Sequence, residues 1–164
     1  MREIILQFAS EYTPGSLLIS FGTRGWCAHV DAVVNTKGDL LGARPFSGVM
    51  VRPANYMRFR RTKVVYLPTT KQIHDDFYDF IYDQCGKRYD YGALVSYAIN
   101  RDWRTNDNWF CSELIAAGLE VSGFFPYRLS NDVNKISPSD LLLLCSVCVN
   151  LFGKQQLAHP FQNS

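Results

Sequence analysis

The sequence has little of what marks metal-binding, nucleic-acid-binding or disulfide-stapled proteins. Its three histidines are scattered, and its single CxxC, Cys145 to Cys148, lies in an apolar run and not in a paired zinc motif. The net charge is only +2 and the basic residues form no long block, so the composition does not indicate nucleic acid as a partner. Five cysteines, an odd number, favour reduced thiols over a disulfide framework.

Membrane and export signals are also scarce. The N-terminal stretch MREIILQFAS reads as a strand and not as a signal peptide, so we expect a cytoplasmic protein, with a phage-encoded or secretion-delivered one as the alternative. The most apolar segment, LLLLCSVCVNLF, is shorter than the ~20 residues of a membrane span. The helix predicted over 138–152 is therefore expected to be buried, and membrane contact through it is the less favoured alternative.

What the sequence does have is the pattern of one α+β domain over residues 1–153, followed by a loose tail over 154–164. Its first half alternates apolar and polar residues between Gly, Asn and Pro turns, which predicts an antiparallel meander. Its second half changes to a helical period. The predicted strands are 3–8, 27–34, LLGARP, VMVRP and 63–68, and the predicted helices are Thr70 to Gly86, 91–99, Cys111 to Gly123, and 138–152.

Cys111 opens a predicted helix in NDNWFCSELIAAGLE. A helix N-terminus has unpaired backbone N–H groups and a partial positive charge, which lower the pKa of a cysteine there and can hold an oxyanion. We expect the N–H groups of Cys111 and Ser112 to do the latter. The alternative is that Cys111 is a small apolar residue that starts a core helix.

His29 is the best-placed base for such a thiol. His74 lies in a polar helix start and His159 in the tail, whereas His29 lies within the strand CAHVDAVV. Strand alternation puts Cys27, His29 and Asp31 on one face. Asp31 could orient the imidazole, although side chains two apart on a strand need not touch. A hydrogen-bonded structural histidine and a surface aspartate remain the alternatives.

The order of these motifs resembles the circularly permuted papain-like thiol hydrolases of the NlpC superfamily, in particular the YiiX-like branch related to lecithin retinol acyltransferase. The resemblance rests on a strand with HV, the hairpin GDLLGARPFSGVMVRP, then GKRYDYGAL, and finally FCSEL at a helix start. It covers about residues 3 to 122. It implies a small antiparallel sheet or half-barrel packed against helices, with Cys111 as nucleophile and His29 as general base.

The same resemblance would place Tyr89 or Tyr91 near the site as substrate or oxyanion contacts, with packing roles as the alternative. It implies no metal and no organic cofactor. Family substrates include cell-wall peptide amides, other amides and lipid acyl esters, and acyl transfer also occurs. The sequence thus predicts a cysteine hydrolase acting on a peptide, a peptidoglycan-type amide or a lipid acyl group.

One departure bears on the triad. Many relatives have a polar residue, often Glu, in the strand after the histidine, where this chain has Gly42. Asp31 or the neighbourhood of Arg44 must then supply the orienting group. The alternative function is a catalytically degenerate binding module that keeps the papain-like scaffold.

Overall fold

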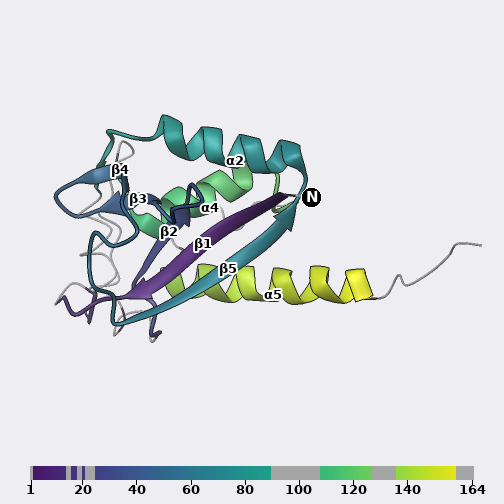
Figure 1. The fold of residues 1–164 in the computed structure, drawn as a ribbon, viewed down its shortest axis with the longest axis horizontal. Coiled ribbons are helices and arrows are strands. Elements are labelled where there is room, and N and C mark those ends of the chain that lie inside the picture. The colour runs from purple at the N-terminus through teal and green to yellow at the C-terminus, as the bar shows by residue number, and fades with distance from the viewer. Residues whose placement is uncertain are drawn as a thin grey trace, which may run out of the picture.

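The computed structural model describes residues 2–13, 16–17, 20, 25–89, 108–126 and 136–157, with the backbone alone for 108 and 150–157. Tyr91, His159 and the helix predicted over 91–99 lie outside these residues, as does 158–164 of the predicted tail. In the described part of the chain, a five-stranded antiparallel sheet packs against three helices (Figure 1). The α+β class predicted from the sequence is confirmed.

The sheet is the meander that the turns predict, extended by two strands. Its spatial order is β4-β3-β2-β1-β5, and every neighbouring pair is antiparallel. The first strand β1 thus lies inside the sheet, between β2 and β5. The five strands are β1 (Arg2–Ser10), β2 (His29–Val33), β3 (Leu40–Arg44), β4 (Gly48–Arg52) and β5 (Arg61–Thr69).

The last strand of the sheet, β5, is longer than the predicted strand 63–68 and continues past Pro68 to Thr69. Pro68 pairs with Glu3 inside β5. A proline lacks the N–H that a ladder needs, but β5 is at the edge of the sheet, where one side of the strand has no partner strand. The basic run from Arg58 to Lys63 leads into this strand and is largely exposed.

The helices begin at the caps that the sequence indicates. In α2 (Lys71–Asp83) the Thr70 hydroxyl accepts a hydrogen bond from the N–H of Ile73 at 3.2 Å. In α5 (Pro138–Leu157) the Ser137 hydroxyl accepts from the N–H of Asp140 at 3.1 Å, and the Asp140 carboxylate accepts in return from the N–H of Ser137. The third helix is α4 (Cys111–Val121).

Helix α5 differs in length and burial from the helix that the sequence predicts over 138–152. It continues to Leu157, past Gly153, because one glycine costs only ~1 kcal/mol inside a helix and the residues around it favour helix. Only one side of α5 is buried: Leu141 and Cys145 are inaccessible, whereas Leu143 is 66% exposed. None of the described helices is long and apolar enough to cross a membrane.

The core lies between the sheet and the helices. Figure 1 shows α4 between α2 and α5, and α4 contacts both helices as well as β2 and β3. The inward side chains of the strands, among them Leu6, Phe8 and Val30, are fully buried together with Leu114 and Ile115 of α4. This packing holds the first turn of α4 against the central strand β2.

Candidate active site

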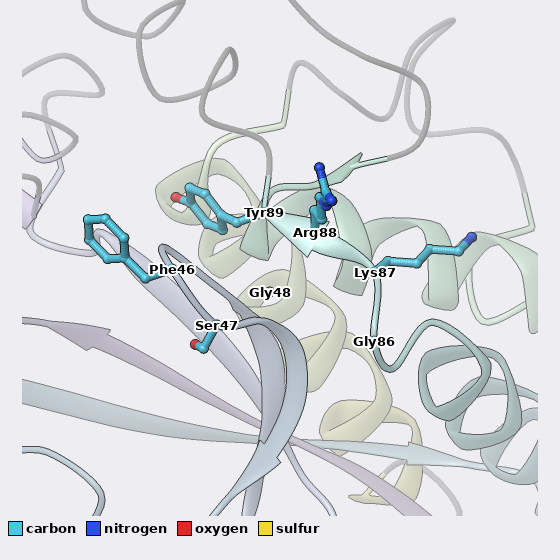
Figure 2. Close-up of a pocket in the computed structure, with 7 residues that line it drawn as sticks. All are labelled: Phe46, Ser47, Gly48, Gly86, Lys87, Arg88 and Tyr89. Carbon is cyan, nitrogen blue, oxygen red and sulfur yellow. The ribbon is translucent and has the colours of Figure 1, made fainter.

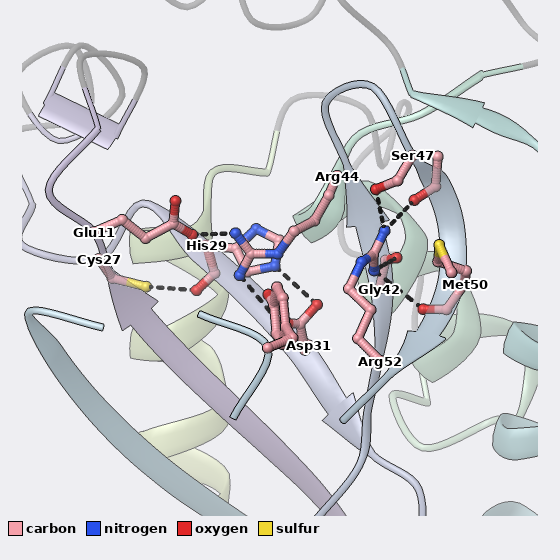
Figure 3. A network of polar contacts seen from close by, with 11 residues as sticks. Glu11, Cys27, His29, Asp31, Gly42, Arg44, Ser47, Met50 and Arg52 are labelled. Carbon is pink, nitrogen blue, oxygen red and sulfur yellow. Dashed lines mark hydrogen bonds and ion pairs between the residues drawn. The ribbon is translucent and has the colours of Figure 1, made fainter. Parts of the chain in front are cut away.

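His29 and Asp31 are in direct contact at the start of β2. Nε2 of His29 lies 2.8 Å from Oδ1 of Asp31, and both side chains are more than nine-tenths buried. The sequence predicted a shared face for these two residues, and the structure shows that they also touch. With Nε2 engaged by the carboxylate, Nδ1 is the ring nitrogen left for a second partner (Figure 3).

The Asp31 carboxylate occupies the space that a side chain at position 42 would fill. Extending the register of Ala32 with Leu41 by one residue puts Gly42 opposite Asp31. A Cβ built on Gly42 would lie 2.0 Å from Oδ1 of Asp31, far inside van der Waals contact. Gly42 therefore makes room for an acid supplied by the histidine's own strand.

A buried ionic network holds this carboxylate from the other side. Nη2 of Arg44 lies 3.4 Å from Oδ2 of Asp31, and Nη1 of Arg44 forms an ion pair with Glu11. The hydroxyl of Tyr56 donates to the same Oδ2 at 3.4 Å, and its ring lies under the guanidinium, 4.9 Å from the centroid. Figure 3 shows His29, Asp31, Arg44 and Glu11 converging from three segments.

The thiol of Cys111 contacts β2 at Val30, the residue after His29. The β2–β3 pairing consists of Ala32 with Leu41 and Val33 with Leu40, although β3 itself continues to Arg44. The two strands are therefore unpaired next to His29. Here the sulfur of Cys111 accepts a hydrogen bond from the backbone N–H of Val30, the residue after His29.

The start of α4 also leaves donors near the thiol. The Glu113 carboxylate accepts from the N–H of Phe110 at 3.2 Å and caps the helix. The N–H groups of Cys111 and Ser112 follow within the first turn, where no intrahelical acceptor exists. The Ser112 hydroxyl does not share this role, because it is fully buried and donates to the carbonyl of Ile136 at 2.6 Å.

Burial decides the charge states of Cys111 and His29. It raises the pKa of the Cys111 thiol, and the hydrogen bond from Val30 does not offset it. The prediction that the helix start lowers this pKa is wrong, because Cys111 is only 1% exposed and its thiolate would be desolvated. Burial and the charge of Arg44 lower the pKa of His29, against the pull of Asp31. Both groups are therefore neutral at pH 7.

Asp31 behaves in the opposite way. Burial by itself raises its pKa, but the charge and hydrogen bond of His29 and the charge of Arg44 outweigh burial and lower the pKa to about 2. The ionised carboxylate only accepts hydrogen bonds, so Nε2 of His29 carries the proton. A neutral imidazole with Nε2–H has its lone pair on Nδ1, the form that a general base needs.

Tyr89 connects Cys111 with a cavity. Its ring packs on Phe110, the residue before Cys111, with centroids 5.8 Å apart, and burial and the nearby Cys111 raise its pKa. The cavity, about 430 Å³, lies between the β3–β4 turn and the segment that ends in β6 (Arg88–Tyr89) (Figure 2). Its lining residues are Phe46, Ser47, Gly48, Gly86, Lys87, Arg88 and Tyr89.

Backbone contacts build this cavity from two distant segments. The N–H of Val49 donates to the carbonyl of Lys87, and the N–H of Gly86 donates to the carbonyl of Val49, both at 2.9 Å. Phe46 at the turn is 98% exposed and has a φ of +67°, a conformation that is rare for a bulky residue. Strained residues of this kind cluster at functional sites.

Sequence reasoning left the orienting group between Asp31 and the Arg44 neighbourhood, and it missed Glu11 and Tyr56. Extending the register of Ala32 with Leu41 by three residues puts Arg44 opposite His29, so knowledge of which strands pair would have indicated its place. Nothing in the local pattern of Glu11 or Tyr56 shows that each turns inward. Of the other histidines, His74 binds its neighbour Asp75 on the α2 surface, away from this network.

Neither a protein-family model nor a curated protein matches this chain. Within the described residues, no group of three His, Cys, Asp or Glu side chains could hold a metal ion. All five cysteines are free thiols.

Proposed function

We propose that the chain is a cysteine hydrolase with a permuted papain-like fold, in which Cys111 is the nucleophile, His29 the general base and Asp31 the orienting acid. The observation that carries the proposal is the 2.8 Å contact between Nε2 of His29 and Asp31, next to the point where the Cys111 thiol reaches β2. It leaves the base lone pair on Nδ1 for the thiol proton. The motif order of the NlpC superfamily supports the same roles.

The neutral pair determines how the reaction starts. Nδ1 of His29 takes the proton from Sγ of Cys111 as the sulfur attacks an amide or ester carbonyl carbon. The backbone N–H groups of Cys111 and Ser112 hold the oxyanion. The imidazolium then protonates the leaving amine or alcohol, and water, deprotonated by His29, cleaves the thioester and restores the thiol. No metal or organic cofactor takes part in this scheme.

The cavity beside Tyr89 is the proposed place for the substrate. Its aromatic walls, Phe46 and Tyr89, suit the apolar part of an acyl compound, which is either a peptide-type amide or a lipid ester. Tyr89 would contact the group next to the reacting carbonyl, since its ring packs on Phe110 directly before the nucleophile.

The test is acyl transfer from p-nitrophenyl esters of increasing chain length, in a Cys85→Ser background because Cys85 is exposed. We expect an acyl adduct that maps to Cys111 by mass spectrometry and is absent in Cys111→Ala. Cys145→Ala is the matched control, since Cys145 is equally buried but lies in α5. His29→Ala should slow acylation by ~10²–10⁴-fold. Turnover that survives Cys111→Ala would refute the proposal.

The second candidate is a non-catalytic binding module. The burial of Cys111, 1% exposed, favours it, because a carbonyl carbon must reach the sulfur. This candidate predicts that ligands fill the cavity at Tyr89 without any adduct. Absence of an acyl adduct in both the parent and the Cys111→Ala variant, with ligand-induced quenching of Trp109 fluorescence in both, would favour binding over catalysis.

A further inference from the structure

Arg44 is the centre of the buried network that surrounds the candidate active site. Its side chain, 9% exposed, contacts two carboxylates from different segments, Asp31 of β2 and Glu11 after β1. The rings of Tyr56 and Phe59 lie 4.9 and 5.7 Å from its guanidinium carbon and cover it. The side chain is thus clamped in one orientation.

The two oxygens of the Asp31 carboxylate contact different partners. Oδ1 faces Nε2 of His29, whereas Oδ2 faces Nη2 of Arg44 and the hydroxyl of Tyr56. A carboxylate that is bound through one oxygen can rotate about its side-chain bonds, and no side chain on Gly42 holds it in place. The contact on Oδ2 is what prevents this rotation.

Stability alone does not explain the arrangement. Buried ion pairs are often no more stable than apolar residues of the same size. Moreover, Nε of Arg44 is buried and has no hydrogen-bond partner among the described residues, so the network is not optimised for stability. Such incomplete satisfaction is expected where a charge is needed at a given point.

We propose that Arg44, anchored by Glu11, is a positioning residue that fixes the Asp31 carboxylate in the space left by Gly42 and so keeps His29 in its Nε2–H tautomer. This inference rests on the proposed function, since the tautomer matters only if Nδ1 accepts the Cys111 proton. It also explains how the chain does without a polar side chain at position 42. Arg44 acts through Asp31 and is not itself a catalytic residue.

The charge of Arg44 adds a second effect on the base. It disfavours imidazolium and lowers the pKa of His29, whereas Asp31 and, less strongly, Glu11 raise it. The charged groups that act on His29 are Asp31 of its own strand, Arg44 of β3 and Glu11 after β1. Arg52 of β4, Tyr56 and, from α4, Cys111 interact with Asp31. Removing Arg44 should therefore raise the pKa of His29.

The test is the double variant Glu11→Gln/Arg44→Met, which removes both charges of the Arg44–Glu11 ion pair and leaves Asp31 with His29 and Tyr56 as its partners. Arg44→Lys is the second variant, because a single ammonium cannot bridge both carboxylates as the guanidinium does. Arg61→Met is the control, since Arg61 stacks on Trp26 at 4.2 Å away from the network. Long-range ¹H–¹⁵N spectra of ¹⁵N-histidine protein report the His29 tautomer without turnover.

We expect the Nε2–H tautomer in the parent and in Arg61→Met, and a mixture of tautomers in both Arg44 variants. In the double variant the acid limb of Cys111 acylation should move to higher pH, with kcat lowered about tenfold or more and KM little changed. A folded double or Lys variant with the parental tautomer and acid limb would overturn the inference. A parent that forms no acyl adduct refutes the proposed function alone, because the tautomer is measured independently.

Discussion

A methyl group at position 42 should separate Asp31 from His29. The added Cβ of Gly42→Ala would lie 2.0 Å from Oδ1 and 3.1 Å from Cγ of Asp31, so the carboxylate must move by about 1 Å or the strands must part. Either movement breaks the 2.8 Å contact with His29. A hydrogen bond to a charged group contributes about 1.5–3 kcal/mol, so we expect a loss of about 2–3 kcal/mol in unfolding free energy. Acylation of Cys111 should fall by about 10²-fold, as for other misplacements of 1 Å.

A double-mutant cycle with Asp31→Ala isolates this clash. Asp31→Ala is itself destabilising, because it leaves Nε2 of His29 without its acceptor and Arg44 with Glu11 as its remaining carboxylate. Once the carboxylate is gone, Gly42→Ala has room and should cost nothing further, or stabilise slightly by restricting the unfolded chain. Urea unfolding of the four proteins should give a coupling energy of about 2 kcal/mol or more. Effects that add within about 0.5 kcal/mol would refute the proposed packing of Asp31 against Gly42.

The remaining predictions concern pH, a helix cap and the turn at the cavity. Because the pKa of His29 is lowered, the acid limb of Cys111 acylation should lie below pH 6.5, and a limb above 7 would contradict the neutral pair. The unfolded chain takes up protons before His29 does, so unfolding free energy should fall as the pH drops below 6.5. The pKa of Asp31 is about 2 in the folded chain against 3.8 in the unfolded chain. Its protonation should therefore lower the unfolding free energy by a further ~2 kcal/mol between pH 4 and pH 2. Thr70→Ala should cost about 1 kcal/mol in urea unfolding through loss of its bond to Ile73, with acylation unchanged. Phe46→Gly should raise Tm by relieving the φ of +67° yet raise KM for long-chain esters, and an unchanged KM would exclude Phe46 from substrate binding.

Local patterns in the sequence were sufficient for most secondary structure. The β-strand alternation and the helix starts at Thr70 and Cys111 each depend on neighbours within a few residues, and the structure confirms them. The prediction that the last helix ends at residue 152 was wrong, because Gly153 does not stop a helix when the flanking residues favour helix.

The candidate site was only partly predictable, because its members come from strands whose pairing is a tertiary property. Alternation put His29 and Asp31 on one face, but their contact at 2.8 Å depends on the space that Gly42 leaves on the next strand. The thiol pKa was predicted in the wrong direction for a similar reason. The helix start of Cys111 is visible in sequence, whereas its burial depends on what packs over it.

By itself, then, the sequence determined most strands and helices of the described chain, the positions of Cys111 and His29 on them, and a gap without a side chain at Gly42. Only the tertiary structure decided that Asp31 fills this gap, and that Arg44 and Glu11 hold it there. Secondary structure follows from interactions within a few residues of chain. A buried ionic network follows from strand register and desolvation, which join residues up to 33 positions apart.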